Sequence, residues 1–284
     1  MWILAFLQYY VLATLALFML SVLGLSKAGF LARSMTVYMS GLVASAAGFV
    51  AAIVMRMVGQ NHSTQWFGGR VMKYICSTLM GLNFYVVDPK NHLGTLRPAV
   101  FVGNHQTELD VLMLGCMFPR HCSITAKSSL KKIPVLGWFM ALSGAIFIDR
   151  ANSKGARGAV SAAGQEMKTR NQSVYMFPEG TRSYSKEPML LPFKKGAFHL
   201  AVETGVPIVP CVVANYSHVL YSKDWVFNSG RIPVKILDPI PTKGLTAEDV
   251  GELSERVRKL MYEELIVLTS EAQGKKFEMP PMES

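Results

Sequence analysis

Residues 98–110 read Pro-Ala-Val-Phe-Val-Gly-Asn-His-Gln-Thr-Glu-Leu-Asp, and this stretch decides the fold class. Its first six residues form a short apolar run that is typical of a buried strand. From Leu109 onward apolar residues continue to Phe118, and the pattern becomes helical. A buried strand that leads directly into a helix is the unit from which α/β proteins are built, so we expect an α/β fold.

The same stretch holds a histidine and an aspartate five residues apart. A neutral imidazole can accept a proton from an attacking hydroxyl when a carboxylate fixes its tautomer and stabilises the resulting cation. Residues five apart on a regular helix point about 140° apart, so His105 and Asp110 meet only if the histidine precedes the helix. With Thr107 as the predicted N-cap and Asp110 at N3, His105 lies on the preceding turn. We therefore treat His105 and Asp110 as candidate catalytic residues.

The pair also has a simpler interpretation. In it, Asp110 only caps the helix, and His105 is one of six histidines with an ordinary hydrogen bond. An isolated His-x-x-x-x-Asp favours this second interpretation, so the catalytic hypothesis depends on what else the chain contains.

The N-terminal part of the chain has the composition of a membrane anchor. Residues 2–26 carry no charge, and a second uncharged stretch runs over residues 34–55, with Lys27 and Arg33 bracketing the short connection. About 22 helical residues reach roughly 33 Å, enough to cross the hydrocarbon core of a bilayer. We expect residues 1–56 to form a transmembrane helical hairpin, with re-entrant insertion of the second segment as an alternative. A cleaved signal peptide is disfavoured because the chain lacks a basic start.

The remaining chain is basic. No acidic residue precedes residue 57, so residues 57–284 hold all 19 acidic and 26 of the 29 basic residues. A basic domain tethered to a membrane attracts anionic head groups and anionic substrates. We expect no nucleic-acid partner, because no aromatic-basic repeat or recognition motif occurs. The four cysteines show neither metal-ligand nor disulfide spacing, so we expect reduced thiols in a cytosol-facing domain.

Short apolar runs alternate with helical segments after residue 57. The predicted strands are residues 84–87, 99–102, 145–148, 173–177, 208–213 and 234–237. Helices are predicted near residues 108–117, 155–170 and 195–204, and a last helix runs from a capping box at 246–249 to about residue 269. We expect one domain over residues 57–272 and a flexible tail over residues 273–284.

Polar and charged motifs follow several of these strands. Residues 144–150 end in Asp-Arg, and residues 177–183 read Phe-Pro-Glu-Gly-Thr-Arg-Ser. Arginine presents a rigid fork of donors suited to phosphate, and glycine lets the backbone approach a ligand closely. Lys194 and Lys195 precede a predicted helix, and Lys127 lies in a loop-like region. Taken singly, the Asp-Arg pair is equally well explained as a surface ion pair, and residues 177–183 can be a simple turn. Lysine runs of this kind are more often solvated faces.

The motifs occur in a fixed order along the chain. Residues 104–110, 144–150, 177–183 and 206–210 together resemble the four blocks of the glycerolipid acyltransferase family. Residues 126–138 and 191–201 are similar to the 1-acyl-sn-glycerol-3-phosphate (lysophosphatidic acid) acyltransferases, particularly those of the fungal type. The resemblance covers most of residues 70–260 and implies a mixed sheet flanked by helices.

The resemblance also implies a reaction. In it, the acyl group of acyl-CoA moves to the sn-2 hydroxyl of lysophosphatidic acid, giving phosphatidic acid in phospholipid and triacylglycerol synthesis at the endoplasmic reticulum. His105 is then the general base, and Asp110 orients it. No Gly-x-Ser-x-Gly motif is present, so direct attack on the thioester is preferred to an acyl-enzyme.

The resemblance assigns substrate contacts as well. It assigns binding of the glycerol phosphate to Glu179, Gly180, Thr181 and Arg182, with Arg182 as the best phosphate ligand. The residues expected to assist with the acceptor phosphate or the CoA phosphates are Lys127, Arg150 and Lys195. Acyl-CoA is a co-substrate, and no metal or other cofactor is expected.

Three alternatives stay open at this point. The acceptor could be glycerol 3-phosphate or another lysophospholipid, which an assay of several acceptors separates. Water could replace the hydroxyl in a membrane thioesterase or lipid hydrolase, which would release free fatty acid without an acceptor. A noncatalytic lipid-binding scaffold is the third alternative, and the intact His105/Asp110 pair speaks against it. Sequence does not predict the oligomeric state.

Overall fold

The computed structural model describes residues 1–149 and 153–278. Within these residues one seven-stranded sheet has the order β1-β9-β6-β2-β5-β3-β4. In chain order its strands are β1 Leu82–Val87, β2 Val100–Gly103, β3 Cys122–Lys127, β4 Ile146–Ile148, β5 Ser173–Met176, β6 Ile208–Val213 and β9 Gly230–Ile236. The predicted α/β class and mixed sheet are confirmed.

The sheet has a parallel part and a reversed edge. Strands β6, β2, β5, β3 and β4 run parallel to one another, whereas β9 is antiparallel to β6 and pairs with β1 in parallel. Every residue of β2, β5 and β6 is buried. Because parallel strands end at one edge of a sheet, the segments that follow β2, β5 and β3 emerge on the same side of the molecule.

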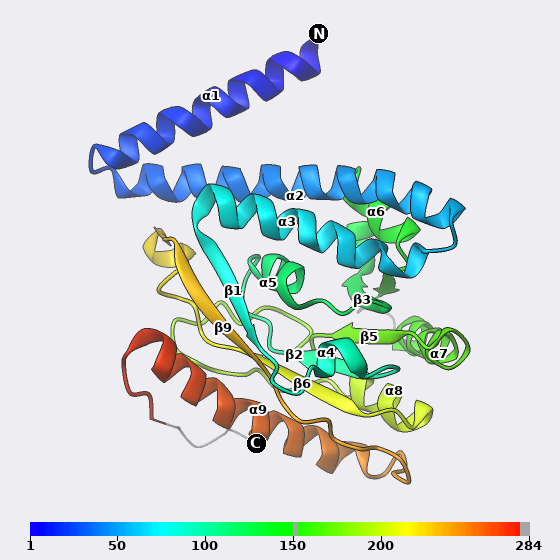
Figure 1. Cartoon of the computed structure of the whole chain (residues 1–284). Helices are drawn as coiled ribbons and strands as arrows, with labels where there is room; N and C mark the ends of the chain where they lie inside the picture. Colours follow the sequence, from blue (N-terminus) through cyan, green and yellow to red (C-terminus); the bar gives the residue numbers. More distant parts are fainter. Residues whose placement is uncertain (150–152, 279–284) are drawn as a thin grey trace.

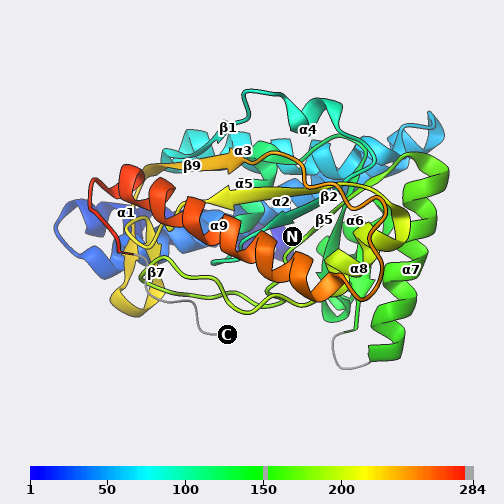
Figure 2. The ribbon, with the colours of Figure 1, turned by 90° about the horizontal axis from the view of Figure 1, so that it is seen from below.

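Helices cover both faces of the sheet (Figures 1 and 2). Helices α3 and α5 lie on one face, and α8 and α9 lie on the other, with α7 packed against α8. Their bounds are α3 Thr64–Met80, α5 Asp110–Met117, α7 Ser153–Arg170, α8 Gly196–Thr204 and α9 Val250–Gln273. A core of apolar side chains fills both interfaces, and the free cysteines Cys76, Cys116, Cys122 and Cys211 are buried in it.

Two N-terminal helices, α1 Trp2–Val22 and α2 Ser26–Met57, are long and apolar enough to cross a membrane. They pack on each other as a hairpin, and α2 also lies along α3 and the short helix α6 Leu136–Leu142 (Figure 1). The expected position of Lys27 and Arg33 at the ends of the connection is wrong, because α2 already begins at Ser26. Arg33 is accommodated by a 3.0 Å hydrogen bond to the Met80 carbonyl, at the C-terminal end of α3.

Other differences concern short or polar elements. Strand β3 was not expected, and Lys127 is its last residue rather than part of a loop. A small hairpin, β7 Leu220–Tyr221 and β8 Val226–Phe227, lies outside the main sheet. The last helix begins at Val250, where the Asp249 carboxylate accepts hydrogen bonds from the Thr246 main chain and hydroxyl. Residues 274–278 turn back onto α9, where Phe277 N–H donates to Ser270 Oγ.

Small residues allow α2 to approach the rest of the protein closely. A Cβ atom at Gly48 would lie 2.6 Å from the Phe139 ring, and one at Gly68 of α3 would lie 2.7 Å from the same ring. Phe139 therefore occupies a space that exists only because both helices carry glycine there. Nearer the N-terminal end of α2, a Cβ atom at Gly41 would meet nothing within 4 Å.

This packing makes a testable prediction. Gly48→Ala should lower the free energy of unfolding by about 1–3 kcal/mol, because the added methyl overpacks against Phe139. Gly41→Ala is the control in the same helix and should be neutral or slightly stabilising, because alanine favours helix. Thermal unfolding of both variants in detergent measures the difference. Equal midpoints would show that α2 is not tightly packed at Gly48.

Candidate active site

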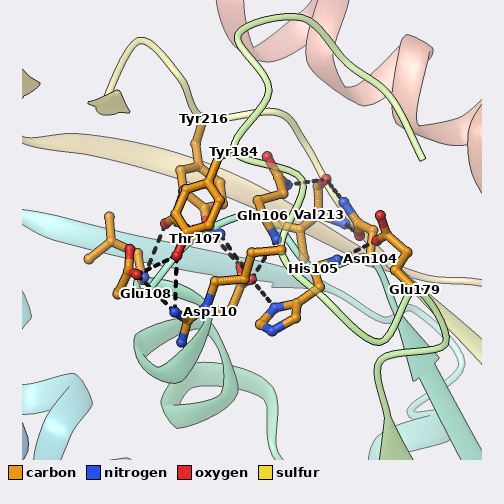
Figure 3. Close-up of polar contacts among 12 residues, drawn as sticks. Asn104, His105, Gln106, Thr107, Glu108, Asp110, Glu179, Tyr184, Val213 and Tyr216 are labelled. Carbon is orange, nitrogen blue, oxygen red and sulfur yellow. Dashed lines mark hydrogen bonds and ion pairs between the residues drawn. The ribbon is translucent and has the colours of Figure 1, made fainter. Parts of the chain in front are cut away.

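The turn between β2 and α5 brings the predicted catalytic pair together (Figure 3). His105 Nδ1 lies 2.7 Å from Asp110 Oδ2, and the histidine precedes the helix, as the spacing requires. The predicted N-cap differs, because α5 begins at Asp110 itself. Thr107 Oγ1 accepts a hydrogen bond from Leu109 N–H, while the Asp110 carboxylate reaches back to the turn.

Asp110 is buried, with 1% of its surface exposed, and both of its oxygens accept hydrogen bonds. Oδ2 accepts from the main-chain N–H groups of Gln106 at 2.7 Å and Thr107 at 3.2 Å, in addition to His105. Oδ1 accepts from the Tyr216 hydroxyl at 2.7 Å. Since the carboxylate is held as an acceptor, we assign the hydrogen of the imidazole to Nδ1 and the free lone pair to Nε2.

The histidine ring is held by stacking as well as by the aspartate. The Phe177 ring lies 4.1 Å from the His105 ring, centroid to centroid, with 16° between the planes. The His105 side chain keeps 14% of its surface exposed, and within the part of the chain that the structure describes Nε2 has no hydrogen-bond partner. A basic nitrogen of fixed orientation is therefore open to an incoming hydroxyl.

Side-chain amides connect the turn of residues 104–109, which carries the candidate base and is called the catalytic turn below, to β6. Asn104 donates from Nδ2 to the Val213 carbonyl and accepts the Val213 N–H at Oδ1, both at 2.9 Å. Gln106 Nε2 donates to the carbonyls of Val213 and Ala214. These bonds continue the contacts between β2 and β6 beyond the last ladder pair, and they keep the backbone around His105 in place.

Glu179, predicted as a substrate ligand, is occupied by main-chain groups. Its Oε1 accepts the His105 N–H at 2.7 Å, and its Oε2 accepts the Leu191 N–H at 2.9 Å. Only 3% of the residue is exposed, and this burial raises the pKa of the carboxyl to about 7 although both hydrogen bonds act to lower it. Glu179 thus ties the segment after β5 to the backbone of His105.

Arg182 lies beside the catalytic turn and meets two residues that sequence reasoning missed. Its Nη1 donates to Glu108 Oε1 at 2.8 Å and to the Tyr184 hydroxyl at 3.1 Å, and that hydroxyl donates to the same carboxylate oxygen. Main-chain bonds from Ser183 and Tyr184 to the carbonyls of His105 and Gln106 fix this proximity. The position of Glu108 between the two catalytic candidates was the signal available in the sequence.

The structure separates the two predicted lysines of the next block. Gly180 has a left-handed backbone with a φ of +69°, and the Lys194 side chain packs where a Cβ atom would be. Lys195 instead points toward the start of α9, because its Nζ lies 3.5 Å from the Cβ position of Gly251. Lys194 therefore reaches the 177–183 segment, whereas Lys195 does not. Thr181 is exposed at the surface of that segment.

The other predicted phosphate ligands lie further along the sheet. Lys127 ends β3, on the same edge as His105 but separated from β2 by β5. Its partner in the ladder is Ile148 of β4. Arg150 lies outside the described residues.

A cavity of about 430 Å³ opens beside the catalytic turn. Helix α2 forms one wall with Phe30, Val37 and Tyr38, and the turn forms another with Thr107 and Glu108. The β7–β8 hairpin closes it with Leu220 and Phe227. The lining is predominantly apolar toward α2 and polar toward Glu108 and Tyr184, the two partners of Arg182, which suits an amphipathic ligand.

The sequence of this chain is similar to those of known proteins. A family model described as Acyltransferase matches residues 85–214. The 1-acyl-sn-glycerol-3-phosphate acyltransferase of Saccharomyces cerevisiae is 43% identical over 218 residues, covering 77% of this chain and 71% of that protein. An uncharacterized acyltransferase of Schizosaccharomyces pombe is 41% identical over 234 residues, covering 82% of this chain and 84% of that protein.

The fold also has a counterpart among solved structures. The crystal structure of the 1-acyl-sn-glycerophosphate (LPA) acyltransferase PlsC from Thermotoga maritima matches with a TM-score of 0.65 and 25% identity. The match covers 85% of this chain and 98% of that chain. Both fungal relatives fit the type that the motifs predict. The chain therefore belongs to the family of the 1-acyl-sn-glycerol-3-phosphate acyltransferases.

Proposed function

We propose that this acyltransferase moves the acyl group of acyl-CoA to the sn-2 hydroxyl of 1-acyl-sn-glycerol 3-phosphate, giving phosphatidic acid for phospholipid and triacylglycerol synthesis. The observation that carries the proposal is the 2.7 Å contact between His105 Nδ1 and Asp110 Oδ2, which directs Nε2 away from the carboxylate. The names of the relatives support the acceptor. The donor and the mechanism are argued from the chemistry of the site.

In the proposed reaction His105 Nε2 takes the proton of the sn-2 hydroxyl as its oxygen attacks the thioester carbonyl carbon. Asp110 stabilises the imidazolium that forms, without itself taking the proton. When the tetrahedral intermediate collapses, the carbon–sulfur bond breaks and His105 returns the proton to the leaving CoA sulfur. Acyl-CoA thus serves as co-substrate, and the proposed reaction uses no other cofactor.

Arg182 is the proposed ligand of the acceptor phosphate, within the segment of Glu179, Gly180 and Thr181. Its Nε is buried and has no hydrogen-bond partner among the described residues, which is a costly state for a donor. A phosphate oxygen would satisfy this donor and compete with Glu108 for Nη1. Lys127, Arg150 and Lys195 remain proposed ligands for the phosphates of either substrate, and for Lys195 this role requires its side chain to turn away from the start of α9.

The cavity next to Arg182 supports an amphipathic acceptor. A lysophospholipid with its phosphate at Arg182 would extend its acyl chain toward the apolar wall formed by α2. We propose that residues 1–56 anchor the enzyme in the endoplasmic reticulum membrane, that residues 57–272 form the catalytic domain on the cytosolic side, and that residues 273–284 form a tail. In this arrangement the acceptor enters the cavity from the bilayer.

The proposed function is tested by an acceptor panel with labelled acyl-CoA and the purified full-length protein. Lysophosphatidic acid should be acylated with the highest kcat/KM, because its phosphate monoester matches the Arg182 site and its acyl chain matches the apolar wall of the cavity. Glycerol 3-phosphate, lysophosphatidylcholine and a reaction without acceptor are the comparisons. Faster acylation of another acceptor would change the assigned substrate, and fatty acid release without acceptor at the full rate would indicate a hydrolase.

The general-base assignment predicts the effect of two substitutions. His105→Ala and Asp110→Asn should each lower kcat about 10²- to 10⁴-fold, because proton transfer from the hydroxyl is lost or the imidazole tautomer is no longer fixed. His199→Ala, at an exposed histidine on α8, is the matched control. Turnover near the wild-type value in folded His105→Ala would exclude His105 as the base.

The phosphate assignment predicts a different kinetic signature. Arg182→Ala should raise KM for lysophosphatidic acid about 10- to 100-fold, as expected for the loss of charged hydrogen bonds, with a smaller effect on KM for acyl-CoA. Arg256→Ala, at an exposed arginine on α9, removes the same charge on the opposite face of the sheet. An unchanged KM for lysophosphatidic acid in Arg182→Ala would remove Arg182 from the phosphate site.

A further inference from the structure

A second group of cationic side chains gathers at the sheet edge opposite the catalytic turn. Arg97 precedes β2, and Arg120 and His121 directly precede β3. His62 lies in the 3-10 turn Asn61–Ser63 between α2 and α3. The rings of His62 and His121 stack with centroids 3.7 Å apart and planes at 15°. Three segments distant in the sequence thus meet at one place.

The positive charge of this group is not balanced by acidic side chains. In the regions covered by the structure, none of the ion pairs involves His62, Arg97, Arg120 or His121. Burial, and then the nearby cations, lower the pKa of both histidines: Arg97 acts on each, and His62 and Arg120 act on His121. An anion bound between these groups would relieve the repulsion among them.

Two arginines are also placed over an aromatic ring. The Arg120 guanidinium lies 4.4 Å from the centroid of Trp66, and the Arg70 guanidinium lies 5.2 Å from it. Arg70 is engaged through Nη1 with the carbonyls of Gly115 and Cys116 at the end of α5. Arg120 and Arg97 are exposed and have no such partner in the described structure, so their donors face solvent.

The group borders the exposed apolar end of α2. Ile53, Val54, Met57 and Val58 are exposed around the last turn of that helix, and His62 follows within five residues. On the neighbouring helix α6, Trp138 is exposed and lies against Phe49 of α2. Cationic side chains next to the apolar end of a membrane helix lie at the depth of the lipid head groups, where the lipid phosphates are.

We propose that His62, Arg97, Arg120 and His121 bind the phosphate of an anionic membrane phospholipid, at a site separate from the catalytic turn. Arginine forks suit phosphate oxygens, and the two imidazoles supply further N–H donors. Lipid is the favoured source of the phosphate because the apolar end of α2 continues directly into the group. The site lies at the N-terminal end of the six-residue strand β3, and the catalytic turn lies at the opposite edge of the sheet. The length of the strand separates the two by about 20 Å.

The proposed site makes lipid binding dependent on pH. A bound phosphate favours the protonated form of His62 and His121, so binding takes up protons. Affinity for the lipid should therefore rise as pH falls from about 8 to about 6. The charged groups that face the two rings from the packed segments are Arg97 and Arg120, with Arg70 behind Trp66, and none of these changes its charge in that range.

The test measures binding of dioctanoyl phosphatidylglycerol to the purified full-length protein in neutral detergent. This lipid is anionic but is neither the proposed acceptor nor the proposed product, so the result does not depend on the proposed reaction. Dioctanoyl phosphatidylcholine, inorganic phosphate and CoA are the comparison ligands. The wild type should bind phosphatidylglycerol more tightly than each of them.

Arg97→Gln with Arg120→Gln should weaken phosphatidylglycerol binding about 30-fold, since each cation near a lipid surface is worth about fivefold. Lys243→Gln with Lys259→Gln removes two exposed charges on the α9 side and should leave binding unchanged. His62→Gln should flatten the pH dependence and serves as an independent variant. Wild-type affinity in the arginine variant, or equal affinity for phosphatidylcholine, inorganic phosphate or CoA, would overturn the lipid site.

Discussion

The arrangement of the active site depends on the buried carboxylate of Asp110. Removing a charged carboxylate from water is expensive unless donors surround it, and here His105, two main-chain N–H groups and Tyr216 do so. To supply these donors, the backbone at Gln106 and Thr107 must turn inward. The segment after β6 must also bring Tyr216 beside the start of α5. The hydrogen bonds of the Asp110 carboxylate thereby hold β2, α5 and the chain after β6 in fixed positions relative to one another.

Glu179 extends the same principle to the segments that follow β5. Its two oxygens accept hydrogen bonds from the N–H groups of His105 and Leu191, so the loop that carries Arg182 and the loop before α8 are both held against the backbone of His105. The Phe177 ring, two residues earlier, completes the support by stacking on the imidazole. Two buried acids and one aromatic ring thus hold the His105 imidazole in place, while the Arg182 side chain remains partly exposed.

Sequence reasoning succeeded where the relevant contacts are local. His105 and Asp110 are five residues apart, so helix geometry alone restricts how they meet. Tyr216 and Tyr184 could not be found in this way, because they reach Asp110 and Glu108 across 106 and 76 residues of chain. Strand β3, Cys-Ser-Ile-Thr-Ala-Lys, lacks a continuous apolar run, and the difference between Lys194 and Lys195 depends on where α8 begins. The presence of Arg33 inside the apolar helix α2 is explained by its hydrogen bond to the Met80 carbonyl at the end of α3, a contact that the sequence does not reveal.

The packing of α2 has a consequence for how the protein is made. One side of this helix is exposed and apolar, but its other side, with Ala32, Ser40, Gly48 and Ala52, is buried against the protein. The core over α3 and α6 is therefore incomplete until residues 26–57 have taken their place. Delivery of the chain to a lipid phase and completion of its globular core become a single event, so a polypeptide that misses the membrane would expose an unfinished interior to quality control.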